Sequence, residues 1–194
     1  MLCVLGLPTA MEPLAPVAPS STMERVAAAV EALPRPISVD VYNDGSWLDR
    51  AIVELASARS VYIASYVYDH PGIQAELCKR LRGEAPCQCR VLVDHWQALH
   101  GPSADMNKYL HALASHDGAL VRVAKGRGRG GEGNMHLKAF VLNGATVYMG
   151  SANLTNAAAG KNWEQVVRIT GSPVVEILKG LNEIWDSPST KVFL

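Results

Sequence analysis

Strand-like and helix-like sequence patterns alternate between residues 37 and 187. The strand-like segments are short and rich in β-branched and aromatic residues, whereas the helix-like segments repeat apolar residues every three or four positions. We expect strands over residues 37–42, 61–68, 90–94, 120–123 and 163–170, and helices over residues 47–58, 73–81, 105–116 and 174–185. This alternation predicts an α/β fold in which a mixed β-sheet is flanked by helices on both faces.

The segments outside this pattern differ from it in composition. Residues 1–36 are rich in alanine and proline, and prolines at that density block regular backbone pairing. We expect a mobile N-terminal extension over residues 1–36, one domain over residues 37–187 and a C-terminal tail over residues 188–194. The extension lacks the basic start of a secretory signal and has too little arginine for a mitochondrial transit peptide. A cytoplasmic location is favoured, and the mitochondrial surface stays open.

Size and charge limit the function classes. A chain of 194 residues that is 48% hydrophobic can bury one substantial core. Its 18 basic and 18 acidic side chains balance, so only a local basic patch, and no overall basic field, can attract nucleic acid. No apolar run approaches the roughly 20 residues that span a bilayer, so we expect no transmembrane segment.

A β-hairpin is expected over residues 138–151, with Asn143 and Gly144 at its turn. A two-residue type I′ turn needs positive φ at both central positions, which Asn-Gly tolerates best. Counting outward from this turn places His136 directly opposite Ser151 on the partner strand, with Cβ atoms roughly 5 Å apart.

Polar side chains converge on one face of this hairpin. Side chains alternate across a strand, so His136 and Lys138 share a face that Ser151 joins from the partner strand. A further strand that begins near Asn162 would place Asn162 and Glu164 on one face, and a carboxylate there can hold the imidazole. The candidate site that results is His136, Lys138, Ser151, Asn153, Asn162 and Glu164. A nucleophilic ring beside a cation and hydrogen-bonding side chains indicates phosphoryl transfer.

The spacing of these residues resembles the signature of the phospholipase D superfamily, His-x-Lys-x4-Asp-x6-Gly-Ser-x-Asn. His136, Lys138, Gly150, Ser151 and Asn153 match it. The Asn-x-Glu at residues 162–164 resembles the small single-motif members, the bacterial endonuclease type and the mitochondrial cardiolipin hydrolase type. Asn143 departs from the pattern because the family has Asp there. Asn keeps the turn and loses the charge, so an inactive phosphodiester-binding module is one alternative.

The resemblance implies a phospholipase D-like catalytic domain with one motif per chain and a role for each residue. His136 would attack phosphorus and form a phosphohistidine, while Lys138 and Asn153 would donate to the phosphoryl oxygens. Glu164 would orient the imidazole, and Ser151 would support the site by hydrogen bonding. Because one imidazole cannot both attack and protonate the leaving oxygen, the resemblance implies a homodimer with its active site at the twofold seam. It implies no metal and no cofactor.

The loop before His136 offers a second clue. Lys125, Arg127 and Arg129 alternate with glycines there, and guanidinium groups bind phosphates bidentately. We expect these residues and Asn162 to bind substrate, with nucleic acid the favoured partner and lipid open. A solvated loop without a binding role is the alternative.

Three cysteines lie close together in the sequence, at Cys78, Cys87 and Cys89. Their spacing is not a usual zinc pattern, and His95 or His100 would have to complete a site. Reduced thiols in a cytosol-like compartment are the favoured interpretation.

Three functions therefore stay open. The first is a metal-independent, non-specific endonuclease on DNA or RNA, and the second is a lipid hydrolase that acts on cardiolipin or another phosphatidyl headgroup. The third is the binding module without turnover.

Overall fold

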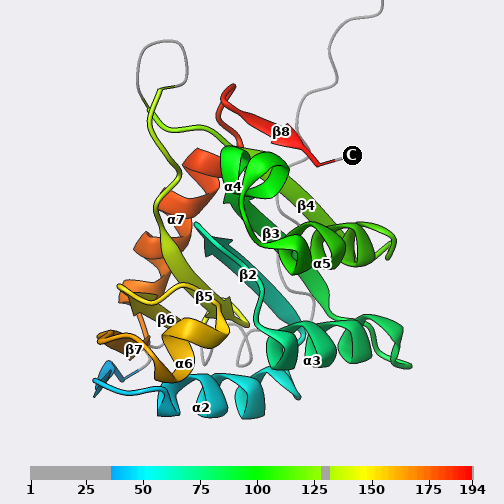
Figure 1. Cartoon of the computed structure of the whole chain (residues 1–194). Helices are drawn as coiled ribbons and strands as arrows, with labels where there is room; N and C mark the ends of the chain where they lie inside the picture. The colour runs from blue at the N-terminus through cyan, green and yellow to red at the C-terminus, as the bar shows by residue number, and fades with distance from the viewer. Residues whose placement is uncertain (1–35, 128–131, 194) are drawn as a thin grey trace, which may run out of the picture. The chain divides into compact units, whose positions relative to one another are not determined.

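Short segments of β-branched and aromatic residues pair into one mixed sheet (Figure 1). The computed structural model describes residues 36–127 and 132–193. Within them the sheet order is β1 (Ser38–Tyr42), β7 (Val166–Thr170), β6 (Thr146–Gly150), β5 (Lys138–Leu142), β2 (Ser60–Ser65), β3 (Gln88–Asp94), β4 (Ala119–Ala124) and β8 (Thr190–Val192). Strands β2, β3 and β4 are parallel, and the other neighbouring pairs are antiparallel.

Helices cover both faces of this sheet, as the sequence predicts (Figure 1). One face packs against α2 (Ser46–Leu55), α3 (Pro71–Arg82) and α5 (Ala104–Ala114), and the other packs against α7 (Pro173–Trp185). Two shorter helices that the sequence did not indicate, α4 (His95–His100) and α6 (Asn156–Gly160), follow β3 and β6. None of the helices in the described ranges is long and apolar enough to span a bilayer.

The two-residue period of the strands divides the core. In β2, Val61 and Ile63 join the cluster under α2, α3 and α5, whereas Tyr62 and Ala64 join the cluster under α7. The fold is therefore the expected α/β arrangement, and the two faces of β2 contribute side chains to two separate hydrophobic cores.

The hairpin between β5 and β6 has the predicted turn and a different register. Asn143 and Gly144 have φ values of 55° and 60°, and Ala145 N donates to Leu142 O at 3.0 Å. The ladder, however, pairs Leu142 with Thr146, one residue beyond the predicted partner. Ala145 stands outside the ladder because its carbonyl oxygen accepts from Gly171 N beyond β7. The predicted pairing of residues 136 and 151 is therefore wrong.

The segment expected as a C-terminal tail contains a short strand. Residues 190–192 form β8 and pair with β4, and the buried Phe193 packs against the His111 ring at a centroid distance of 4.7 Å and a tilt of 53°. The described residues, 36–127 and 132–193, belong to one compact unit. The expected N-terminal extension lies outside the described residues apart from Pro36.

Candidate active site

The residues of the candidate site lie along one edge of the sheet. The parallel strands β2, β3 and β4 end there at Ser65, Asp94 and Ala124, and β5 begins there because Lys138 is paired with Ser65. In open α/β sheets, ligands bind beyond the carboxyl ends of the parallel strands. This edge is therefore where the fold presents side chains to a ligand.

His136 and Lys138 are in direct contact. The imidazole is exposed immediately before β5, and Lys138 is half-buried. Lys138 Nζ lies 3.2 Å from Nδ1 and 3.3 Å from Nε2 of His136, and it donates to the His136 carbonyl oxygen at 3.1 Å. Burial lowers the pKa of Lys138 from its ordinary value, and the Glu164 carboxylate partly offsets this effect. The site thus combines an accessible ring with a partly desolvated cation.

Ser151, Asn162 and Glu164 form a second group of contacts. Ser151 Oγ donates to Glu164 Oε2, and Asn162 Nδ2 donates to Glu164 Oε1 at 3.2 Å. Gln165 N also donates to Ser151 Oγ, at 3.0 Å. Among the described residues no hydrogen bond joins Glu164 to His136, so the carboxylate is held beside Lys138 by its own two partners.

Asn153 is fixed to the segment that follows β2. Its Oδ1 accepts from Val67 N at 3.3 Å, and the next residue, Leu154, donates through its N–H to Ser65 Oγ at 3.4 Å. Because the amide oxygen is engaged, the amide N–H groups of Asn153 remain as donors for a ligand.

Asn143 lies at the opposite end of the hairpin. Its Oδ1 accepts from Arg59 N at 2.7 Å and from Ser60 N at 3.2 Å, and its own N–H donates to Ser60 O at 2.8 Å. It lies seven positions after His136 along mostly extended chain, a distance of roughly 20 Å. The residue at the departing motif position therefore caps the start of β2 and does not contact the site.

Two of the three predicted loop cations border a pocket beside the imidazole. Lys125, Arg127 and His136 line a pocket of about 560 Å³ together with Met135, Leu137 and Ile184. Both cations are exposed, whereas Arg129 lies outside the described residues. At Gly126 a Cβ atom would lie 2.4 Å from the Gly133 carbonyl carbon, so this part of the loop requires glycine for close backbone approach.

Apolar side chains are also exposed near the site. The Trp163 side chain, between Asn162 and Glu164 in the sequence, is 97% exposed, and Leu137 beside His136 is 39% exposed. Single exposed apolar residues are ordinary, but two next to candidate site residues provide apolar contact area for a ligand or a partner.

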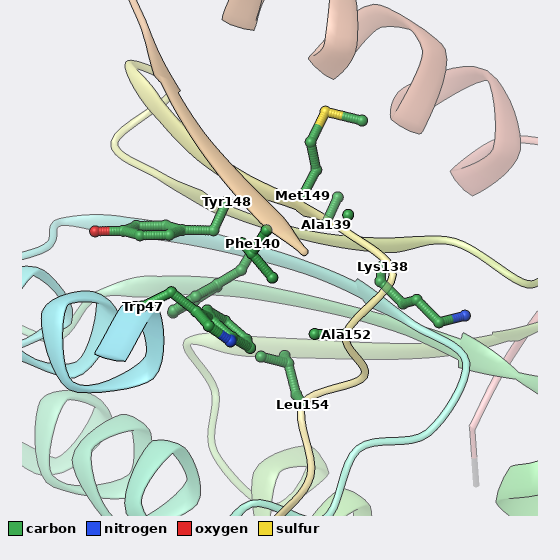
Figure 2. A pocket seen from close by; sticks show the side chains of 10 residues that line it. Trp47, Lys138, Ala139, Phe140, Tyr148, Met149, Ala152 and Leu154 are labelled. Atoms are coloured by element: carbon green, nitrogen blue, oxygen red, sulfur yellow. The ribbon is translucent and has the colours of Figure 1, made fainter. Parts of the chain in front are cut away.

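The cavity beneath Lys138 is too small for a substrate. Figure 2 shows Trp47, Phe140 and Tyr148 around this cavity, with the Lys138 side chain extending away from them. Its volume is about 10 Å³, close to the space that one water requires. It is therefore part of the core under the site.

Sequence reasoning missed Tyr66 and Gln97, which the fold brings to the site. The Tyr66 ring lies 4.7 Å from the His136 ring between centroids, and the Tyr66 hydroxyl accepts a hydrogen bond from Gln97. An aromatic residue at the carboxyl end of a buried strand was the only sequence signal, and it does not identify the contact with His136.

The described residues contain no group of three or more His, Cys, Asp and Glu side chains that could hold a metal ion. Cys78, Cys87 and Cys89 are free thiols, and the last two are buried. Burial raises the pKa of both buried thiols above its ordinary value, so they remain protonated core side chains.

Several solved structures have folds similar to that of this chain. NucT from Helicobacter pylori is similar in structure, with a TM-score of 0.68 and 20% identity, covering 81% of this chain and 100% of that chain. Nuc from Salmonella typhimurium, described as a phospholipase D family member, has a TM-score of 0.63 and 21% identity, covering 81% and 97%. Phosphatidylserine synthase from Haemophilus influenzae has a TM-score of 0.61 and 18% identity, covering 83% and 41%. No curated protein matches the sequence significantly.

A family model shows the membership directly. The model described as "Cardiolipin synthase, PLD-like domain" matches residues 51–185, more than half of the chain. This match spans every residue of the candidate site and confirms the resemblance that the His136 motif indicates. The chain therefore belongs to the phospholipase D superfamily, and its fold is that of the single-motif bacterial proteins NucT and Nuc.

Proposed function

We propose that the chain is a metal-independent phosphodiesterase that forms a phosphohistidine on His136, and that it acts as a non-specific endonuclease on DNA or RNA. The observation that carries the proposal is the Lys138 ammonium 3.2 and 3.3 Å from the two ring nitrogens of the exposed His136. A phosphorus atom in reach of that ring has its oxygens beside the cation, where negative charge accumulates in the transition state. The amide of Asn153 adds hydrogen-bond donors.

The proposed reaction has two steps. A ring nitrogen of His136 attacks phosphorus, so that a P–N bond forms while the bond to the leaving oxygen breaks. The attacking ring cannot protonate that oxygen, and the proton comes from the His136 of a second copy in a twofold homodimer. Water then attacks the phosphohistidine with the second imidazole as base, which releases the phosphate product and restores the first ring. The exposure of His136 is compatible with a seam at this edge.

Glu164 has a positioning role in this scheme. Its carboxylate is held by Ser151 and Asn162 within the field of Lys138. When the exposed imidazole rotates toward Glu164, the carboxylate accepts a hydrogen bond from the N–H of the ring nitrogen that does not attack. This hydrogen bond fixes the tautomer of the ring.

The position of Asn143 argues against the inactive binding module. An amide oxygen and a carboxylate oxygen can both accept the hydrogen bonds from Arg59 N and Ser60 N that this site provides. Since the position is at the far end of β5, exchange of Asp for Asn leaves the charges around His136 unchanged.

The surroundings of His136 support a polyanionic substrate. Lys125 and Arg127 line the same pocket as the imidazole, so the phosphates on either side of the scissile one would meet cations.

A lipid phosphodiester is the second candidate, and the exposed side chains of Trp163 and Leu137 favour it. Indole and leucine side chains at the rim of a site can rest on acyl chains or headgroups. The match to a model described as cardiolipin synthase points the same way.

Parallel assays separate these candidates. A labelled oligonucleotide and cardiolipin vesicles are incubated with the protein in excess EDTA, with His136→Asn as the inactive variant. His116→Asn is the matched control because His116 lies before β4, at the opposite edge of the sheet. The proposal predicts oligonucleotide cleavage by wild type and by His116→Asn only. Cleavage of cardiolipin alone would transfer the assignment to lipid, and equal activity of His136→Asn would refute both.

A further inference from the structure

One aromatic ring contacts both residues at the centre of the proposed chemistry. Tyr66 directly follows β2, and its ring centroid lies 4.7 Å from that of His136 at an interplanar angle of 54°. Lys138 Nζ lies 5.4 Å from the centroid of the same ring. Tyr66 therefore faces the imidazole and the ammonium together.

Tyr66 is itself held by hydrogen bonds. Gln97 Nε2 donates to the Tyr66 hydroxyl at 2.7 Å, and Tyr66 N donates to the carbonyl oxygen of Leu137 at 3.0 Å. The first bond holds the outer end of the ring, and the second ties Tyr66 to the residue after His136. Among the described residues, no hydrogen bond joins the Tyr66 hydroxyl to the imidazole, so the contact between the two side chains is one of rings.

The residue before His136 is fixed through the same helix. Asp94, only 1% exposed, caps α4 by accepting from Gln97 N at 3.0 Å, and its second oxygen accepts from Met135 N at 2.9 Å. A buried carboxylate that accepts two main-chain N–H groups is a strong local anchor. The backbone on both sides of His136 is thus tied to one network of Asp94, Gln97 and Tyr66.

We propose that Tyr66, held in place by Gln97, is a positioning residue for His136 and Lys138. This inference rests on the proposed function and adds a residue to it. An exposed imidazole has several rotamers, and the Tyr66 ring excludes those in which the imidazole would occupy its place. The electron-rich ring face also attracts the Lys138 ammonium and so limits its motion. Both effects favour the geometry of attack without any contact with substrate.

The test compares two substitutions at Tyr66. Tyr66→Phe keeps the ring and loses the bond to Gln97, whereas Tyr66→Leu loses the ring. We expect Tyr66→Leu to lower kcat by about 10- to 100-fold with KM changed less than about threefold, because a small misplacement of the reacting groups is costly. Tyr66→Phe should retain at least about a third of the wild-type kcat, since the ring contact persists.

Tyr62→Leu is the matched control, because Tyr62 lies on the same strand with its hydroxyl bonded to Leu181 O at 2.9 Å in the other core. It should lower the melting temperature and leave kcat unchanged below that temperature. A readout independent of turnover is the NMR shift of the His136 ring protons, which should lose its ring-current contribution in Tyr66→Leu and keep it in Tyr66→Phe.

The outcomes distinguish this inference from the proposed function. If Tyr66→Leu leaves kcat unchanged, or changes KM alone, Tyr66 is not a positioning residue. An equal loss in Tyr66→Phe and Tyr66→Leu would assign the effect to the hydroxyl and overturn the role of the ring. If His136→Asn is as active as wild type, the proposed function fails, whereas the NMR comparison still reports whether Tyr66 holds the ring.

Discussion

Asn143 and Ser60 are joined by two hydrogen bonds, from Asn143 N to Ser60 O at 2.8 Å and from Ser60 N to Asn143 Oδ1 at 3.2 Å. This pair joins the hairpin turn to the start of β2, at the sheet edge opposite His136. The one departure from the superfamily signature is therefore explained by backbone architecture, and its effects should appear in stability.

Asn143→Asp should leave the cleavage rate within about threefold of wild type, since Asp also accepts both N–H groups and tolerates positive φ. Asn143→Ala should lower the free energy of unfolding by about 1–2 kcal/mol, because it leaves the Arg59 and Ser60 N–H groups without this acceptor. Denaturant unfolding and single-turnover cleavage measure the two effects. A gain of tenfold or more in Asn143→Asp would instead support the inactive-module alternative.

Lys138 should titrate below the ordinary lysine pKa, because burial disfavours its charged form. If the ammonium stabilises the transition state, kcat should fall as pH rises through this lowered pKa, before the ordinary lysine pKa of 10.5 is reached. The free energy of unfolding changes with pH in the opposite direction. The unfolded chain binds the Lys138 proton more tightly than the folded chain does. Between the lowered pKa of the folded chain and the ordinary pKa, the contribution of Lys138 to the free energy of unfolding therefore rises with pH.

Lys138→Met should therefore abolish turnover without lowering the melting temperature. A pH–rate profile and thermal unfolding of the two proteins check this. A loss of melting temperature as large as that of a core substitution would show that Lys138 has a structural role.

The contacts around Glu164 predict coupling with Ser151. Glu164→Gln should lower kcat by about 10-fold or more, because it removes the charge proposed to orient the imidazole. Ser151→Ala should have a smaller effect on kcat, and the two losses should not add, since Ser151 acts through the carboxylate. A double-mutant cycle on kcat measures the coupling, and strictly additive losses would contradict it.

Lys125 and Arg127 should contribute to binding of a nucleic acid through phosphate contacts. The double substitution to Gln should reduce the slope of log affinity against log salt by about 1 to 2 for an oligonucleotide. Lys79→Gln is the control, because Lys79 lies on α3 and already bonds Glu76. An unchanged slope in the double variant would remove both cations from the binding surface.

Much of the fold follows from local patterns, and the exceptions depend on length or on distant contacts. The Asn143–Gly144 turn and the long helices were predictable from composition and period. Helix α4 has six residues and β8 three, too few for a period to show. The hairpin register differs because Ala145 bonds to Gly171, a residue far along the chain.

Some contacts of the candidate site were likewise predictable from the sequence, whereas others depend on how distant segments meet. The strand period predicted that Lys138 lies beside His136. It placed Ser151 opposite His136 and Glu164 at the imidazole, whereas in the structure Ser151 bonds Glu164. It did not predict that Tyr66 contacts His136 or that Gln97 bonds Tyr66, because those contacts arise only when β2, α4 and the segment before β5 meet at one edge.

The proposed reaction requires a covalent bond between His136 and phosphorus. Single-turnover reaction with a labelled oligonucleotide in excess EDTA, quenched in base because phosphohistidine is labile in acid, measures it by label retained on the protein and mapped by peptide analysis. We expect label on the peptide that contains His136 in wild type, and neither label nor cleavage in His136→Asn. Cleavage by His136→Asn at the wild-type rate, or label on another residue, would contradict it.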